Sequence, residues 1–63
     1  MKVNGKQVEY EALTLLDYLR KHGYRPDYVV AERAKEVITR ERFGDILLRE
    51  DDEINILQFM GGG

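Results

Sequence analysis

The residues best placed to do chemistry are the three glycines at the end of the sequence, Gly61, Gly62 and Gly63. Glycine has no side chain to pack and loses more conformational freedom on ordering than any other residue. These glycines therefore add little to a core, but they form a thin backbone that reaches about 10 Å past Met60 when extended. We expect this tail to carry the carboxylate of Gly63 into a narrow channel of another protein. The alternative is a frayed end or a leftover linker.

A terminal carboxylate needs help before it can react. At neutral pH it is a poor electrophile, so it must be given a good leaving group in a site that holds phosphate and magnesium. The sequence contains no phosphate-binding loop and no evident pairing of a nucleophile with a base. It contains no cysteine, which excludes a disulfide framework, a thiolate metal site and a cysteine nucleophile. We therefore expect the chain to be a substrate of other enzymes rather than an enzyme.

Size and charge exclude several other classes of protein. With 63 residues the chain is expected to form one domain, near the lower limit for a self-sufficient core. A charged fraction of 35% and a net charge of -2 give no basic footprint for nucleic acid. No apolar run approaches the roughly 20 residues that span a bilayer. The first residues, 1–5, lack the apolar core of a signal peptide, so we expect a cytoplasmic protein.

The first third of the chain predicts a hairpin followed by a helix. Asn4-Gly5 is a strong signal for a two-residue turn, because both residues tolerate positive φ angles. The expected arms are 1–3 and 6–10. Thr14 is a good helix N-cap, and Gly23 suits the left-handed position after the last helical turn.

The rest of the chain predicts three more strands. They are expected at 28–33, at 36–38 and from Ile54 onward, with a turn or short helical stretch at 39–44 anchored by Phe43. The short first arm needs a second neighbour, and the last strand is strongly apolar, so we expect the two to pair in parallel. The prediction is an α+β protein of the β-grasp class, a mixed sheet with one main helix packed on one face. The domain spans 1–60, and 61–63 form a flexible tail.

The last strand also suggests a docking patch. Its side chains alternate, which places Ile54 and Ile56 on one face and Leu57 and Phe59 on the other. If the helix covers the first pair, the second pair is exposed beside the tail and available to a partner. The alternative is that a loop covers it. Met60 is expected either to fill a groove of the partner or to end the core.

Several other groups have ordinary interpretations. His22 is expected at the surface, stabilised by the helix C-terminus. The acidic run 50–53 lacks the spacing of a calcium loop, so we expect a solvated turn and no metal site. The tyrosines are expected to be core or core-edge residues; they are Tyr10, Tyr18, Tyr24 and Tyr28. A loose basic cluster is expected to form a solvated face; its members are Arg33, Lys35, Arg40 and Arg42.

Taken together, the element order, the helix beginning at Thr14-Leu15 and the ending from Asp52 to Gly63 resemble the ThiS family. These proteins are the ubiquitin-like β-grasp sulfur carriers of thiamin biosynthesis. The resemblance covers the whole chain, and its most specific parts are the terminal Gly-Gly and the apolar strand before it. Many members have Asn-Gly between the two central strands, where this chain has Ala34-Lys35. The following residues 36–38 and Arg40 keep the family pattern.

The resemblance implies a chemistry and a set of partners. An adenylating enzyme would use ATP to activate the carboxylate of Gly63, and sulfur from a cysteine desulfurase or another donor would convert it to a thiocarboxylate. Thiazole synthase would then take the sulfur. The carrier itself would bind no cofactor. The absence of cysteine agrees with this chemistry, because no side-chain thiol could hold the sulfur instead.

Three other functions remain open on the sequence. A sulfur carrier for molybdopterin has the same fold and ending but is usually longer. A ubiquitin-like modifier would join Gly63 to lysines of other proteins. A β-grasp interaction module would use no covalent chemistry and would work without Gly62 and Gly63.

Overall fold

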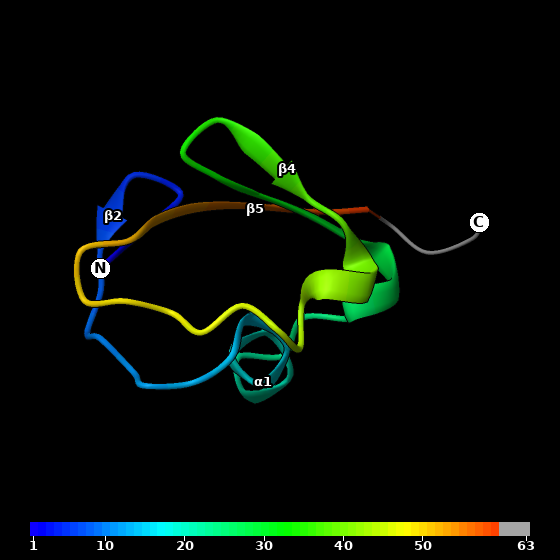
Figure 1. Ribbon diagram of the computed structural model, residues 1–63, viewed down its shortest axis with the longest axis horizontal. Helices are drawn as coiled ribbons and strands as arrows, with labels where there is room; N and C mark the ends of the chain where they lie inside the picture. The colour runs from blue at the N-terminus through cyan, green and yellow to red at the C-terminus, as the bar shows by residue number, and fades with distance from the viewer. Residues whose placement is uncertain (60–63) are drawn as a thin grey trace.

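The computed structural model describes residues 1–59. It shows a five-stranded mixed sheet with a helix against one face (Figure 1). The strands lie in the order β2-β1-β5-β3-β4. The elements are β1 (Lys2–Val3), β2 (Lys6–Gln7), α1 (Leu15–Lys21), the 3₁₀ helix η1 (Pro26–Tyr28), β3 (Val29–Arg33), β4 (Glu36–Ile38), the 3₁₀ helix η2 (Arg40–Arg42) and β5 (Glu53–Gln58). This arrangement confirms the predicted β-grasp fold. None of the helices within residues 1–59 is long and apolar enough to cross a bilayer.

The last strand lies in the middle of the sheet. β5 pairs in parallel with β1, with Val3 opposite Ile54, and in antiparallel fashion with β3, with Val30 opposite Leu57. The parallel pairing was expected from the short first arm and the apolar last strand. β1 and β5 therefore pair directly with each other, and Figure 1 shows β5 running lengthwise through the sheet.

The first hairpin turns where Asn4-Gly5 predicts it. The φ angles are 53° at Asn4 and 82° at Gly5, in the left-handed region. The second arm is shorter than predicted, because β2 ends at Gln7. From there the chain leaves the sheet, and the hydroxyl of Tyr10 donates a hydrogen bond of 3.1 Å to the carbonyl of Leu48.

Helix α1 begins and ends at the predicted signals. The hydroxyl of Thr14 accepts a hydrogen bond of 3.2 Å from the backbone N–H of Asp17, and Gly23 has a φ of 83° after the last turn. Leu15 and Leu19 are fully buried against the sheet. The core joins this face of the helix to the inner face of the sheet. Its members are Met1, Val3, Leu15, Tyr18, Leu19, Val29, Ala31, Ile38, Phe43, Ile46, Leu48, Ile54 and Ile56.

The second hairpin makes a tight turn without Asn-Gly. Arg33 pairs with Glu36, so only Ala34 and Lys35 lie between the strands, with φ angles of 54° and 65°. For residues with a Cβ this region costs roughly 1–2 kcal/mol each. The pairing of β3 with β4 and the burial of Ile38 and Phe43 on either side of η2 offset that cost.

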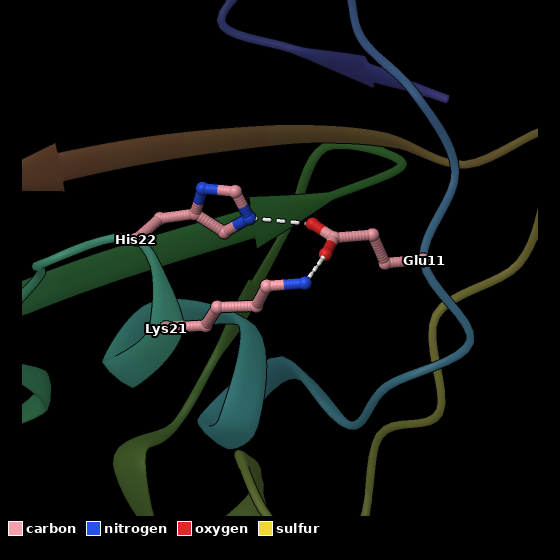
Figure 2. Close-up of polar contacts among 3 residues, drawn as sticks. All are labelled: Glu11, Lys21 and His22. Atoms are coloured by element: carbon pink, nitrogen blue, oxygen red, sulfur yellow. Dashed lines mark hydrogen bonds and ion pairs between the residues drawn. The ribbon is translucent and has the colours of Figure 1, made fainter.

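A polar cluster ties the segment before the helix to the end of the helix. The carboxylate of Glu11 accepts a hydrogen bond from the ammonium of Lys21 and contacts the imidazole Nε2 of His22 (Figure 2). The hydrogen bond from Lys21, followed by that from His22, lowers the pKa of Glu11 below its ordinary value. The same contact with Glu11 raises the pKa of Lys21. His22 caps α1 at its C-terminus, as expected, but it also joins this cluster.

Candidate functional site

The two faces of β5 differ sharply in exposure. Ile54 and Ile56 point toward α1 and are 2% and 6% exposed. Leu57 and Phe59 point the other way and are 60% and 53% exposed. The predicted alternation is confirmed, and no part of residues 1–59 covers the second pair. The structure does not test whether a partner docks there, so that role stays a prediction.

A third apolar side chain extends this exposed surface. Val30 on β3 lies directly opposite Leu57 and is 37% exposed. We call Val30, Leu57 and Phe59 the outer patch. The sequence predicted a strand over 28–33 but did not connect Val30 to the docking patch. The signal was available, since an apolar residue on the outer face of a central strand is unusual unless something covers it.

The chain is held firmly up to the last described residue. The backbone N–H of Phe59 donates a hydrogen bond of 2.8 Å to the carbonyl of Tyr28. The backbone N–H of Arg25 donates one of 2.7 Å to Oε1 of Gln58. Segment 25–28 thus braces the end of β5 from the β3 side, and the guanidinium of Arg25 lies 5.7 Å from the ring centre of Tyr28. Phe59 therefore has a defined position at the edge of the outer patch.

The predicted chemical residues come next in the sequence. Met60, Gly61, Gly62 and Gly63 lie outside the described residues, so their predicted roles are carried forward as predictions. β5 runs toward the end of the sheet where η1 and η2 lie, away from the first hairpin (Figure 1). Phe59, the last described residue, therefore lies at that end of the sheet.

The acidic run 50–53 is not entirely the solvated turn that was predicted. The Oδ2 atom of Asp52 accepts a hydrogen bond of 2.7 Å from the backbone N–H of Arg49 and lies 3.4 Å from Nη1 of Arg33. The Asp52 side chain is only 11% exposed. A carboxylate that closes its own turn and pairs with a distant arginine is structural. Within residues 1–59 no group of three acidic or histidine side chains is placed to hold a metal ion.

The predicted basic face does not form a continuous patch. Arg33 pairs with Asp52 at one end of β3, and Arg40 pairs with Asp27 of η1 at the other. Lys35 lies at the tip of the second hairpin and Arg42 is exposed in η2. The four cations thus lie in two regions, Arg33 and Lys35 at one end of β3 and Arg40 and Arg42 in η2.

The tyrosines follow the core and core-edge prediction to different degrees. Tyr18 is buried, and its burial raises the pKa of its hydroxyl. Tyr24 is half-buried and packs on the core. Tyr10 and Tyr28 are each more than a third exposed; the hydroxyl of Tyr10 bonds to Leu48, and the ring of Tyr28 lies beside the guanidinium of Arg25.

Comparison with known proteins gives a consistent result. A sequence model described as the ThiS family matches residues 1–63. The sulfur carrier protein ThiS of Bacillus subtilis is 35% identical, over the whole of this chain and 98% of that protein. A thiazole synthase of Magnetococcus marinus is 40% identical over 97% of this chain, which spans only 19% of that protein.

Solved structures agree with the sequence comparison. The crystal structure of the thiamine biosynthesis protein ThiS from Geobacter metallireducens has a TM-score of 0.75 and 33% identity, covering 98% of this chain and 96% of that one. The solution structure of a thiamine biosynthesis protein from the same organism gives the same TM-score and identity, with 85% of that chain covered. The fold, the exposed end of β5 and these matches lead to one conclusion: the chain belongs to the ThiS family of sulfur carrier proteins.

Proposed function

We propose that this protein carries sulfur for the thiazole of thiamin as a thiocarboxylate on Gly63. The observation that carries the proposal is the match with the Bacillus subtilis sulfur carrier protein across nearly the full length of both chains. The geometry fits this role. The core of the domain is packed, and β5 is braced up to Phe59 beside an exposed apolar surface.

The chemistry requires three partners. In the adenylating enzyme, an oxygen of the Gly63 carboxylate attacks the α-phosphorus of ATP and releases pyrophosphate. The terminal sulfur of a persulfide, formed on a cysteine desulfurase or another donor, then attacks the acyl carbon and AMP leaves. A thiol cleaves the resulting acyl disulfide, which leaves the thiocarboxylate. Because the first step consumes ATP, the proposed compartment is the cytoplasm.

The proposed acceptor of the sulfur is thiazole synthase. Nearly the whole of this chain resembles one region of the Magnetococcus marinus thiazole synthase, which is about five times as long. A carrier-like region and a synthase thus share one polypeptide in that protein. Such a joining keeps two partners at a high effective concentration, which supports the same partnership for this protein.

Each residue at the end of the chain has a distinct role in the proposal. Leu57 and Phe59 dock on the partner, and Met60 fills a groove beside them. Gly61 and Gly62 pass through a channel too narrow for side chains. Gly63 carries the sulfur. The protein itself binds no cofactor and no metal, and it is a substrate rather than a catalyst.

The test is an intact-mass measurement. After incubation with the adenylating enzyme, ATP and a sulfur donor, the protein should gain the mass difference between sulfur and oxygen. Omitting ATP should abolish the gain. Gly63→Ala should fold normally and be converted at least about tenfold more slowly, because its Cβ obstructs the channel. An unchanged mass of the unaltered protein, with a partner shown to be active, would contradict the proposal.

A further inference from the structure

The two edges of β5 differ in how far their backbone groups are hydrogen-bonded to a neighbouring strand. The hydrogen bond from the N–H of Phe59 to Tyr28 shows that Phe59 directs its backbone groups toward β3. Alternate residues of a strand direct these groups to opposite edges. Those of Leu57 therefore also face β3, and those of Ile54, Ile56 and Gln58 face the side of β1.

β1 covers only the first part of that second edge. It pairs with β5 no further than Ile54, and the chain then turns away at Asn4-Gly5. Asn4 extends the pairing by one step. Its backbone N–H donates to the carbonyl of Ile54 at 2.9 Å, and its Oδ1 accepts from the N–H of Ile56 at 2.7 Å. Beyond this point, the carbonyl of Ile56 and the N–H and carbonyl of Gln58 have no backbone partner within residues 1–59. We call these three groups the open edge.

A cleft lies on the helix side next to the open edge. Its volume is about 410 Å³, and its apolar lining comes from Val3, Val8, Tyr18 and Tyr24. Asn4 lines one end of the cleft, and Tyr24 precedes Arg25, whose N–H contacts Gln58. Asn4, the last residue of the first hairpin to bond to β5, therefore connects the cleft to the start of the open edge, and the rest of the lining comes from the hairpin and the end of α1.

The rim of the cleft is basic. Lys6 and His22 line it. His22 already contacts Glu11, whereas Lys6 has no ion pair within the part of the chain that the structure describes. An acidic side chain near Lys6 would thus find an unneutralised ammonium.

We propose that the open edge accepts an extended strand of thiazole synthase, an inference that rests on the proposed function. Three unpaired backbone groups in a row call for another backbone rather than for side chains alone. The added strand places one large apolar side chain in the cleft, with an acidic residue near Lys6. Its side chains on the opposite face lie beside Leu57, so the added strand and the outer patch form one continuous contact surface.

The first test removes one group of the open edge. Gln58→Pro eliminates the N–H that faces away from β3, a position where proline is tolerated in an edge strand. The matched control is Gln58→Ala, which keeps that N–H but, like proline, loses the side-chain contact with Arg25. Affinity for thiazole synthase is measured by calorimetry. The Kd of the proline variant should exceed that of the alanine variant at least about tenfold, because a hydrogen bond is lost and the ring obstructs the edge. Equal values would overturn the proposal.

The second test uses the unaltered protein and does not depend on how the variants fold. Hydrogen exchange of individual amides is followed by NMR with and without thiazole synthase. The amide of Gln58 should exchange rapidly in the free carrier and become protected in the complex. The amide of Leu57, which faces β3, should be protected in both states and serves as the reference. A complex that leaves Gln58 unprotected would overturn this inference alone. Failure to form any complex would also count against thiazole synthase as the partner.

Discussion

The two faces of β5 show how this small protein divides its apolar side chains between the core and the exposed surface. Ile54 and Ile56 lie beneath the sheet and are almost fully buried, while Leu57 and Phe59 lie on top and are more than half exposed. All four side chains are apolar, and they lie within six consecutive residues. The difference is therefore one of use. The inner pair stabilises the fold by leaving water when the chain folds, and the outer pair stays exposed in the folded chain, where we propose that a partner docks.

Such a division is demanding for a domain of 63 residues. A chain of this length buries only about 60% of the surface that its unfolded state exposes, so each core side chain contributes a large share of the stability. Because Val30, Leu57 and Phe59 stay exposed, their apolar surface does not contribute to the stability of the fold. The comparison between the faces therefore leads to separate predictions for stability and for binding.

The sharpest test exchanges one residue on each face for alanine. Ile56→Ala should lower the free energy of unfolding by about 2–4 kcal/mol, because it leaves a cavity beneath the sheet. Leu57→Ala, next to it in the chain, should change it by less than about 0.5 kcal/mol. Urea denaturation followed by circular dichroism measures both. Similar losses for the two variants would mean that the outer face also belongs to the core.

Charges on the outer patch should affect binding rather than folding. Leu57→Asp or Phe59→Asp should weaken binding to thiazole synthase at least about tenfold, because a desolvated carboxylate is placed against an apolar partner surface. The matched control is Val37→Asp, since Val37 is 63% exposed on the same face but lies on β4, away from the end of β5. Calorimetry gives the Kd values. An equal loss for the Val37 variant would show that the contact is not confined to the patch.

The second hairpin allows stability to change without altering either face of β5. Replacing Ala34-Lys35 by Asn-Gly should raise the free energy of unfolding by about 1 kcal/mol, because both positions have left-handed φ angles. Thermal denaturation measures the gain, and the Kd for the partner should stay unchanged. A less stable variant would mean that the present residues make a contact that offsets their strain.

The polar cluster at Glu11 should give the smallest effect, and only in acid. Because the pKa of Glu11 is lowered in the folded protein, the carboxylate stabilises the fold above its ordinary pKa of 4.5. That contribution disappears as the pH falls through the lower folded value. Denaturation midpoints of the unaltered protein and of Glu11→Gln should therefore differ at pH 6 and converge toward pH 3. A gap that stays constant with pH would assign the effect to packing.

Local signals accounted for most of the fold. Asn4-Gly5, Thr14 and Gly23 act on the backbone within a few residues, so their turn, cap and helix end could be predicted from the sequence. The alternation from Ile54 to Phe59 likewise fixed which side chains face the helix. The central place of β5 followed from the first arm's need for a second neighbour.

The features that could not be predicted depend on contacts between distant segments. The role of Asp52 requires Arg33 to approach from β3, and the side chain of Asn4 finds Ile56 only after β1 and β5 have paired. The position of the turn at Ala34-Lys35 followed from the strands predicted on either side of it, but its left-handed φ angles are opposite to the local preference of these residues and are imposed by the strand pairing. The open edge is likewise a property of the assembled sheet and has no signature in the sequence.

The parallel pairing of β1 with β5 has a consequence for how the protein is made. Until residues 53–58 have left the ribosome, the nascent chain lacks the strand that joins the first hairpin to the second. Contacts between distant parts of a sequence form slowly, and here they connect the first strand with the last. The sheet therefore cannot close until residues 53–58 are available, and a chain cut off before them should remain open to proteases.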